Sequence, residues 1–385
     1  MKNILFLHTG ADLYGADIVL LELLKGIDRS NFCPVVVLPE DGILAKKIKH
    51  EGVDVYIKKY PILRRKYFNV KGIFDYVSNY IRCSQEIVDL VKKKEIDLVY
   101  VNTVAVLEGV YISRKIKRPL IWHVHEIIDS PKFVNLFICF LLGRFADAIV
   151  AVSHAVEKHL LESKMINSKK INVIYNGIDS SVFNPNNEHE YIKKELHIPS
   201  DSFVVGMIGR INAIKGQDEF VEICKPLIKN NNNVWGIIVG NAYAGQEWRE
   251  TELIERIEKE ELNDKLLYIG YRKDIRNIHS LFDILVLPSV RPDSLPTVVL
   301  EAMASEKVVV GYKNGGISEM VVDGETGFLE EIYDHTSLSN DIDRLIHNKR
   351  LYDEMAKKGK DRQTELFSKE TFISKIETLL LSINE

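Results

Sequence analysis

Short apolar runs alternate with longer amphipathic segments along the first half of the chain. The runs are rich in branched residues and flanked by polar ones, which is typical of buried strands in a parallel sheet. The segments between them carry apolar residues at helical spacing, such as Ile18, Leu21 and Leu24. This alternation predicts a doubly wound sheet covered by helices. The predicted strands are 3–7, 34–38, 53–57, 97–101, 119–123 and 148–152.

A second series of strands follows a hydrophilic stretch. The Asn176-Gly177 pair and the polar residues 184–191 are typical of a linker between domains. Further strands are predicted at 203–208, 234–239, 265–269, 284–287 and 307–310. The sequence therefore predicts an α/β protein with two domains, 1–183 and 184–364, each with a parallel sheet of its own. A last helical pattern covers about 365–385.

The loop after the predicted strand 284–287 carries two acids and leads into a helix. Pro296 suits the first helical position, and Ser294 is the nearest side chain that could cap the helix. Free N–H groups at a helix start beyond a strand end favour an anionic ligand. We expect Glu301 to accept hydrogen bonds from two sugar hydroxyls and Asp293 to reach another polar group. The alternative is that both acids only place negative charge near a helix start.

The loop after the predicted strand 203–208 carries two cations, Arg210 and Lys215. A planar guanidinium and a compact ammonium can bind one diphosphate together, and they stabilise the charge that grows when its bond to a sugar breaks. The alternative is a pair of exposed basic residues that contribute little. Gly270-Tyr271 closes a neighbouring strand, where Tyr271 could border a nucleotide base.

A glycine-bearing loop, HTGADLYG, follows the first predicted strand. Gly10 and Gly15 have the spacing of a nucleoside-triphosphatase P-loop, but Ala16 and Asp17 stand where that motif needs Lys and Ser or Thr. A GxGxxG dinucleotide motif is absent from the sequence too. The loop therefore supports neither a P-loop triphosphatase nor a nicotinamide-dependent enzyme.

The composition is that of a soluble globular protein, with 46% hydrophobic and 28% charged residues. No apolar run of about 20 residues predicts a membrane span, and the first apolar run ends at His8, too early for a signal peptide. The cysteines are scattered, so neither a disulfide framework nor a zinc site is predicted. A net charge of -4 argues against a nucleic-acid partner. We expect a cytoplasmic protein.

The segment 58–67 is both basic and apolar. Its basic residues are Lys58, Lys59, Arg64, Arg65 and Lys66. Such a loop can rest on an anionic membrane, at about 1 kcal/mol per basic residue, which would place the protein at the inner face of the plasma membrane. The alternative is a solvated surface loop. The stretch 133–142 is apolar nearly all round, which favours a buried helix over a membrane-facing one.

Two pairs of potential metal ligands stand close together in the sequence. His123 and His125 lie at the end of a predicted strand, where a buried histidine is more often a hydrogen-bonded core residue than a catalyst. Asp341 and Asp343 have the DxD spacing of some metal sites, but they lie in a predicted amphipathic helix, and we interpret them as its solvated face. No third ligand has a recognisable spacing, so no metal site is predicted.

Several motifs of this chain occur together in one known family. They are PSVRPDSLPTVVLEAMA at 288–304, GR…KG at 209–216, the His125-Glu126 pair, AVS at 151–153 and YNGID at 175–179. With these motifs the sequence resembles the family 4 retaining glycosyltransferases over nearly its whole length. The family's acidic motif is Glu, seven residues, Glu, whereas the first acid here is Asp293.

The resemblance implies the GT-B fold, in which two Rossmann-like doubly wound domains face a cleft and a C-terminal helix crosses back to the first domain. It implies transfer of a hexose from a UDP- or GDP-linked sugar to a hydroxyl of a glycan or lipid-linked acceptor in bacterial surface polysaccharide synthesis. Retention would result from same-face attack assisted by the leaving phosphate. No carboxylate nucleophile, metal ion or cofactor would be needed, since the nucleotide sugar is a co-substrate.

The resemblance also implies roles for single residues. His125 would lie near the transferred sugar, and Gly15 would belong to a turn at the donor diphosphate. The expected catalytic residues are His125, Arg210, Lys215 and Asp293. The expected donor-binding residues are Gly15, Gly209, Tyr271, Ser294, Leu295, Pro296, Thr297 and Glu301.

Two other functions fit the same motifs. A nucleotide-sugar epimerase of this architecture would bind the donor without a second substrate. A non-catalytic subunit would keep the nucleotide-sugar pocket but lose turnover through the shorter Asp293. Incubation with the nucleotide sugar alone, and with a panel of acceptors, would distinguish these functions from transfer.

Overall fold

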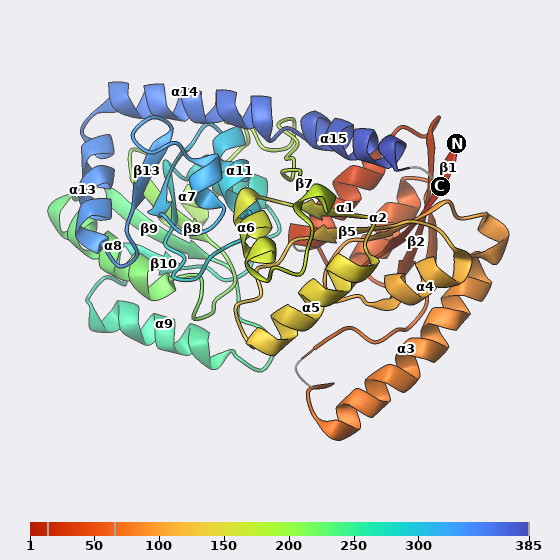
Figure 1. Ribbon diagram of the computed structural model, residues 1–385. Helices are drawn as coiled ribbons and strands as arrows, with labels where there is room; N and C mark the ends of the chain where they lie inside the picture. Colours follow the sequence, from red (N-terminus) through yellow and green to blue (C-terminus); the bar gives the residue numbers. More distant parts are fainter. Residues whose placement is uncertain (14, 65–66, 384–385) are drawn as a thin grey trace. The chain divides into compact units, whose positions relative to one another are not determined.

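The apolar runs form two parallel sheets, which Figure 1 traces in the computed structural model. The structure describes residues 1–13, 15–64 and 67–383, so Arg65 and Lys66 of the basic segment lie outside the described residues. The chain divides into a first unit, Met1–Gly177 with Lys369–Glu385, and a second unit, Ile178–Ser368. The predicted fold class, two doubly wound α/β domains, is confirmed.

The first unit contains a sheet in the order β3-β2-β1-β4-β5-β6-β7. Its strands are β1 (Lys2–Leu7), β2 (Phe32–Leu38), β3 (Asp54–Ile57), β4 (Leu98–Val101), β5 (Leu120–Val124), β6 (Ala148–Ala151) and β7 (Ile171–Val173). Its helices are α1 (Gly15–Gly26), α2 (Ile43–His50), α3 (Val70–Val91), α4 (Glu108–Ile116), α5 (Lys132–Phe145), α6 (His154–Glu162) and α15 (Lys369–Ser382), with the 3-10 helices η2 (Lys92–Lys94) and η3 (Ser168–Lys170). The strand β7 is not among the predicted strands, because it is a short edge strand that is only half-buried and has no marked apolar run.

The last helix of the chain belongs to the core of the first unit. Phe372 and Ile376 of α15 are buried with residues of α1, α2 and one face of the sheet. A methyl group on Gly26 would lie 2.1 Å from the Cδ1 atom of Ile373, so α1 and α15 pack closely there. The Lys2 ammonium also donates hydrogen bonds to the carbonyl groups of Leu380 and Ile383, at 2.9 and 2.8 Å.

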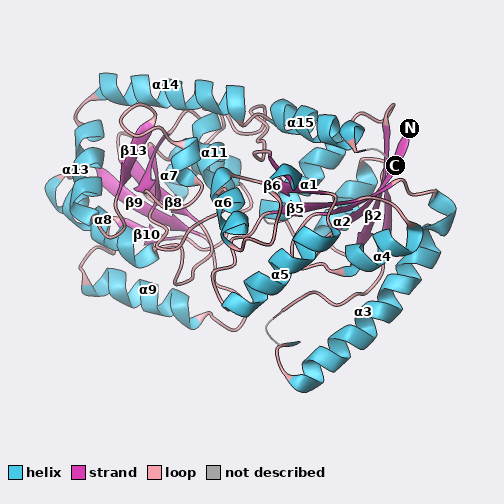
Figure 2. Ribbon diagram, in the orientation of Figure 1, coloured by secondary structure: helices cyan, strands magenta, loops and turns pink. Residues whose placement is uncertain are grey.

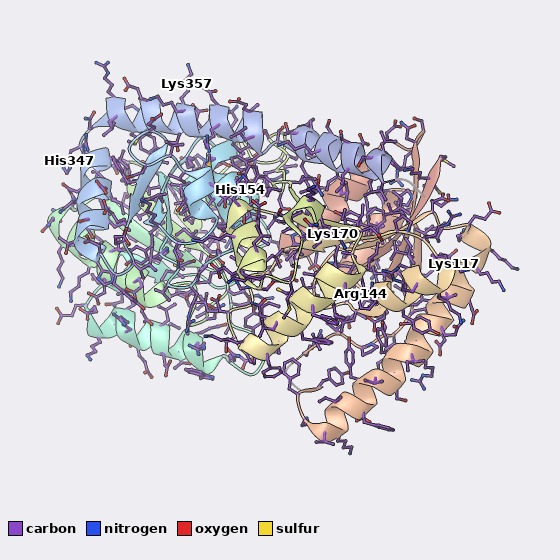
Figure 3. The ribbon with its side chains drawn as sticks, viewed as in Figure 1. Lys117, Arg144, His154, Lys170, His347 and Lys357 are labelled. Carbon is purple, nitrogen blue, oxygen red and sulfur yellow. The ribbon has the colours of Figure 1, made fainter. Side chains whose placement is uncertain are left out.

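Helix α5 buries only one of its faces. Ile138 and Leu142 are buried, whereas Phe133 and Phe137 are 62% and 47% exposed. The expectation that 133–142 is buried is therefore wrong for one face, because uniform hydrophobicity hides which side meets the sheet. Lys170, which is labelled in Figure 3, fixes the C-terminal end of α5 by donating to the carbonyl oxygens of Gly143 and Ala146, at 3.0 and 2.7 Å. Among the described residues, no helix has the length and apolar character needed to cross a bilayer.

The second unit contains a sheet in the order β10-β9-β8-β11-β12-β13, with helices on both sides of the strands (Figure 2). Its strands are β8 (Phe203–Ile208), β9 (Val234–Val239), β10 (Leu266–Tyr268), β11 (Ile284–Leu287), β12 (Val308–Tyr312) and β13 (Gly327–Glu330). Its helices are α7 (Glu190–Glu195), α8 (Gln217–Asn230), α9 (Trp248–Lys259), α10 (Ile275–Leu281), α11 (Thr297–Ala304), α12 (Ile317–Met320), α13 (His335–Ile346) and α14 (Lys349–Leu366). The strand β13 was missed because GFLE begins with glycine and ends with a charge.

Residues 178–183 and 365–368 belong to the second unit, although the sequence analysis assigns them to the first domain and its C-terminal helix. The amide of Ile178 donates to the carbonyl of Phe367 at 2.9 Å. The Ser180 hydroxyl donates to the Gln363 side chain at 3.1 Å. These bonds join the segment after the linker glycine to the end of α14, which sets the boundary before Ile178.

In each sheet there is one pair of neighbouring strands at which the strand order reverses, so that successive strands are added on the other side of the first strand. In the second unit β9 and β10 extend from one side of β8, whereas β11 pairs with its other side. In the first unit the corresponding pair is β1 and β4. Chain segments that leave such a pair continue to opposite sides of the sheet, and the crevice at the carboxyl ends of the pair is where open α/β sheets bind ligands.

The loops after β8 and β11 are packed against each other at this position. Gly216 has a left-handed backbone with φ of +78°, and a Cβ atom there would lie 2.0 Å from the carbonyl oxygen of Pro288. The amide of Val290 donates to the carbonyl of Ile214 at 2.9 Å. Only glycine allows this approach, so the two loops are held in a fixed relation.

Replacing Gly216 with Ala should destabilise the second unit more than the same change at Gly245. Gly245 has a similar φ of +83° but open space around it, so it isolates the cost of the left-handed backbone. We expect Gly245→Ala to lower the Tm by about 2–4 °C. Gly216→Ala should lower it by more than twice that amount in the same thermal melt. Equal shifts would show that the contact with Pro288 is unimportant.

A buried carboxyl group lies at the start of α4. Glu108 is fully buried, and its carboxyl oxygens have no hydrogen-bond partner among the described residues. Burial raises its pKa to about 8, so the native chain holds a proton near neutral pH that an exposed glutamate would release.

The free energy of unfolding should therefore fall as the pH rises from about 4.5 to about 8, because the native chain binds the more protons in this interval. Glu108→Gln removes this titration. From pH 4.5 to pH 8, the free energy of unfolding of the variant should increase by about 1–3 kcal/mol relative to that of the wild type. Chemical denaturation at several pH values measures it, and parallel curves for both proteins would contradict the prediction.

Candidate active site

Lys215 and Asp293 are brought together at the carboxyl ends of β8 and β11. The Lys215 ammonium donates to both Asp293 carboxylate oxygens, at 2.8 and 2.9 Å. The Ser289 hydroxyl also donates to Asp293, at 2.7 Å. Both charged side chains are half-buried, and the pair leaves hydrogen-bonding capacity on each group for a polar ligand.

Arg210 lies on the same loop as Lys215 but has different partners. Its guanidinium donates to the Asn241 side chain at 3.0 Å and stands 5.0 Å from the centroid of the Tyr243 ring. The Gln217 side chain donates to the Arg210 carbonyl at 2.9 Å and thereby ties the loop to the first turn of α8. The cation is therefore positioned by the loop after β9 as well as by its own loop.

Gly209 follows β8, and Tyr271 comes after β10, which is separated from β8 by β9. A Cβ atom on Gly209 would stand 3.7 Å from the Cγ atom of Lys215, so the aliphatic part of this lysine side chain packs over the glycine. A Cβ atom on Gly240, which has a φ of +138°, would lie 1.9 Å from the Gly209 carbonyl. Tyr271 is exposed just after the left-handed Gly270, at the end of β10.

Glu301 is far less accessible than the sequence analysis implies. It is 5% exposed, and one carboxylate oxygen lies 2.9 Å from the Nε2 atom of His279 on α10. The His279 ring is fully buried and packs edge-on against Phe183, with ring centroids 5.6 Å apart. One carboxylate oxygen of Glu301 therefore has a buried partner already.

The start of α11 differs in detail from the prediction. The helix begins at Thr297, so Pro296 precedes its first residue, and no side chain caps it, which corrects the predicted role of Ser294 as a cap. Thr297 is half-buried and Leu295 is buried. The loop is instead fixed by the chain after β12, because a Cβ atom on Gly316 would lie 2.2 Å from the Ser294 carbonyl. The amide of Gly316 also donates to the Asp293 carbonyl at 2.8 Å.

In the first unit a chain of polar side chains leads from the ends of β1 and β4 to His125, which directly follows β5. The Nε2 atom of His8 lies 2.5 Å from Asp17, and the Asn102 amide nitrogen lies 3.3 Å from the other His8 ring nitrogen. The Asn102 oxygen lies 3.2 Å from the Nε2 atom of His125. Gly15, also predicted at the donor, is exposed at the start of α1 with open space around it.

Burial, and then the neighbouring His8, lower the pKa of His125 to about 3, while Asp17 opposes the shift. The imidazole is therefore neutral at physiological pH. The Asn102 oxygen can only accept, so Nε2 of His125 carries the proton and Nδ1 is left as an acceptor. The adjacent Glu126 carboxylate accepts hydrogen bonds from Thr103 and from the His125 amide, and burial raises its pKa.

The Asp341 and Asp343 pair is on α13, as predicted, but it is not a fully solvated face. Both residues are half-buried, and Asp343 accepts a hydrogen bond from Asn231 at 3.1 Å. Burial, and then the neighbouring Glu330, raise the pKa of Asp341 to about 7. Across the described residues, no group of three or more His, Cys, Asp or Glu side chains could hold a metal ion.

The sequence analysis missed the side chains that position the predicted ones. These are His279 and Ser289 in the second unit and His8, Asp17 and Asn102 in the first. Most directly follow a strand or begin a helix, so their place at a strand's carboxyl end could have marked them. His279 lies within the short helix α10 and has no such signal.

Two family descriptions match the two halves of this chain. Residues 14–182 match Glycosyltransferase Family 4, and residues 188–362 match Glycosyl transferases group 1.

Two relatives match over most of their length. N-acetyl-alpha-D-glucosaminyl L-malate synthase of Bacillus anthracis is 23% identical over 325 residues, 82% of either chain. UDP-Gal:alpha-D-GlcNAc-diphosphoundecaprenol alpha-1,3-galactosyltransferase of Escherichia coli is 25% identical over 354 residues, 87% of this chain and 88% of the relative.

The fold also matches solved structures over the full length. Anabaena Alr3699/HepE, solved with UDP and with UDP-glucose, has a TM-score of 0.85 and 26% identity, with 100% of both chains covered. The sheets, the motifs and both family matches agree. This chain belongs to the family 4, group 1 glycosyltransferases and has their GT-B fold.

Proposed function

We propose that this glycosyltransferase moves a hexose from a UDP-linked sugar to an acceptor hydroxyl, with retention of configuration, in the synthesis of a bacterial surface polysaccharide. The acceptor is a glycan or a lipid-linked intermediate. The proposal includes roles for Arg210 and Lys215 at the leaving diphosphate, Glu301 at the ribose and Asp293 at the sugar.

The observation that carries this proposal is the Lys215–Asp293 pair between the two loops at β8 and β11. A departing nucleoside diphosphate gains negative charge, and a fixed ammonium beside it lowers the energy of that state. The carboxylate on the same ammonium can accept hydrogen bonds from sugar hydroxyls. One pair of side chains thus connects the leaving group to the transferred sugar, as same-face attack requires.

The choice of donor rests on similar proteins. Anabaena Alr3699/HepE has been solved with UDP and with UDP-glucose, and the Escherichia coli relative is named for a UDP-Gal donor and a lipid diphosphate acceptor. The Staphylococcus aureus relative is named as a capsular polysaccharide biosynthesis glycosyltransferase, and it is 25% identical over 66% of this chain. These names support a UDP-sugar and a polysaccharide context, and a GDP-sugar is the alternative donor.

His125 contributes to the proposed reaction as a neutral hydrogen-bond acceptor. Its Nδ1 atom would receive a hydrogen bond from a hydroxyl of the transferred sugar, since Nε2 is engaged by Asn102. The low pKa of His125 supports this role because a charged imidazole could not accept. Asp17, His8 and Asn102 would act through His125 by holding its ring orientation and its tautomer.

Transfer is tested by incubating the protein with UDP-glucose, UDP-galactose and GDP-mannose, with and without a panel of glycan and lipid-linked acceptors. A glycosylated acceptor and released nucleoside diphosphate support transfer. A new free nucleotide sugar without acceptor would identify an epimerase instead. Nucleotide-sugar binding with no product in any mixture would identify a binding subunit.

Lys215→Ala should lower kcat by more than about tenfold, because it removes positive charge from the leaving diphosphate. The exposed Lys357→Ala on α14 is the matched control, since it removes one lysine from the same unit and should leave kcat unchanged. Steady-state kinetics with a saturating acceptor measure both. An unchanged kcat in Lys215→Ala would remove the diphosphate role from this residue.

We also propose that no resident metal ion takes part, since two fixed cations can neutralise the diphosphate. The rate of transfer should then stay within about twofold after treatment with a chelator and dialysis. A loss of activity that Mg²⁺ or Mn²⁺ restores would contradict this proposal.

The proposed location is the cytoplasm, at the inner face of the plasma membrane. The described part of the basic segment supports it, because Lys59 and Arg64 are exposed and Lys58 is half-buried, with its ammonium 3.5 Å from Glu86.

A further inference from the structure

An apolar cavity of about 580 Å³ lies in the first unit between α3, α5 and the chain that precedes α3. Aromatic side chains supply much of its wall, including Tyr67, Phe68, Tyr76, Tyr80, Phe133 and Phe137. The rings of Phe68 and Phe133 meet edge to face at 5.7 Å, which joins the chain before α3 to the start of α5. The volume lies within the usual range for a small-molecule pocket.

The walls of this cavity are unusually exposed for apolar residues. On α3, Ile73 is 55% exposed and Val77 is 48% exposed, and both line the cavity. They face Phe133 and Phe137 of α5 across it. Monomeric proteins rarely leave a continuous apolar surface of this kind to water unless it binds something. Figure 1 shows the two helices that form it, α3 and α5.

Cations border one end of the cavity. Tyr67 also lines a second cavity of about 590 Å³, together with Lys58, Lys59 and Arg82. Tyr67 also lines a third cavity of about 170 Å³, whose charged lining residues are Lys59, Arg64 and one acid, Glu40. Within the described part of the chain, neither Lys59 nor Arg64 has an ion-pair partner, so both can take up an anion.

The third cavity leads to the carboxyl edge of the sheet. Thr9 follows β1 and Pro39 follows β2, and both line it. The buried Tyr60 hydroxyl donates to the His8 carbonyl, at 2.5 Å, and the Val37 carbonyl lies 3.0 Å from the same hydroxyl, which fixes the basic segment over these strand ends. An apolar cavity, a cationic border and the polar strand ends with His8 therefore follow one another within the first unit.

We propose that the apolar cavity holds the hydrocarbon chain of a lipid phosphate or diphosphate that carries the acceptor sugar. The phosphate groups bind Lys59 and Arg64, and the sugar lies at the carboxyl edge of the first sheet. This inference rests on the proposed function and specifies its acceptor as an amphiphile with an anionic linkage.

The shape and the charges favour this occupant over two others. A bilayer surface would be met by protruding side chains, whereas the aromatic wall here surrounds a hollow large enough for a chain. A second copy of this protein would either bring its own Lys59 and Arg64 close to these cations, which would repel them, or leave the cations without an anionic partner. Only an amphiphile with an anionic head matches both the hollow and the cations at one end.

The test is equilibrium binding of farnesyl diphosphate, farnesol and inorganic diphosphate to the full chain by calorimetry. Farnesyl diphosphate should bind at least about tenfold more tightly than inorganic diphosphate, because the chain is buried. Val77→Glu with Phe137→Glu should remove that difference. The matched control is Phe74→Glu with Phe140→Glu, two residues that are 74% and 52% exposed on the same helices and do not line the cavity. Lys59→Glu with Arg64→Glu should weaken the binding of farnesyl diphosphate but not the binding of farnesol.

Each other outcome overturns the proposal. Equal affinity for farnesyl diphosphate and inorganic diphosphate would mean that the cavity takes no chain. The protein could instead bind phosphatidylglycerol vesicles but not farnesyl diphosphate. If the cavity variant (Val77→Glu with Phe137→Glu) and its control (Phe74→Glu with Phe140→Glu) then weaken vesicle binding equally, the apolar surface binds the bilayer. Sedimentation could also show a dimer that only Val77→Glu with Phe137→Glu dissociates. The cavity would then be an interface with a second copy of this protein.

Binding needs no turnover, so this result is independent of whether transfer occurs. UDP binding, measured in parallel, should be the same in the wild type and in all three variants, which also verifies that they fold. If the lipid binds while no acceptor is glycosylated, the proposed function fails and the lipid site stands.

Discussion

The arrangement of the second unit depends on a steric constraint at Gly216, where the loop after β8 meets the loop after β11 at the carbonyl of Pro288. A side chain at this position would separate the loops, and the separation of the loops sets the distance between the cation on one and the acid on the other. The ion pair of Lys215 and Asp293 is therefore a consequence of a backbone contact. Its geometry needs no ligand to form, because the backbone has brought both loops together already.

Acidic side chains near the strand ends each have a partner of opposite or compatible character. Asp293 has Lys215, Glu301 has His279, and Asp17 has His8. A partly buried charge without a partner would be costly, so each pair offsets this cost and orients its side chains at the same time. A ligand must then share or replace a partner, which favours ligands rich in hydroxyl and phosphate oxygens over apolar ones. This polarity agrees with the nucleotide-sugar donor proposed above.

Strands were predictable where burial on both faces produces an uninterrupted apolar run, and β8, β9 and β11 have the predicted limits. Short or edge strands such as β7 and β13 were not, because they lack such a run. The loop residues Lys215 and Asp293 were found from position and resemblance, but their mutual contact depends on the register of β8 and β11, which no local pattern contains. His279 meets Glu301 only through tertiary packing of α10 on α11, and the exposed face of α5 was hidden by its uniform hydrophobicity.

The position of α15 has a consequence for biosynthesis. The second unit is continuous in sequence, whereas the core of the first unit includes a helix that begins at Lys369. During translation the nascent sheet around β1 must wait for nearly the entire chain to leave the ribosome before α15 can cover it. Its apolar surface under α1 and α2 remains uncovered in the meantime, so this half of the protein is exposed to aggregation for longer than the second unit.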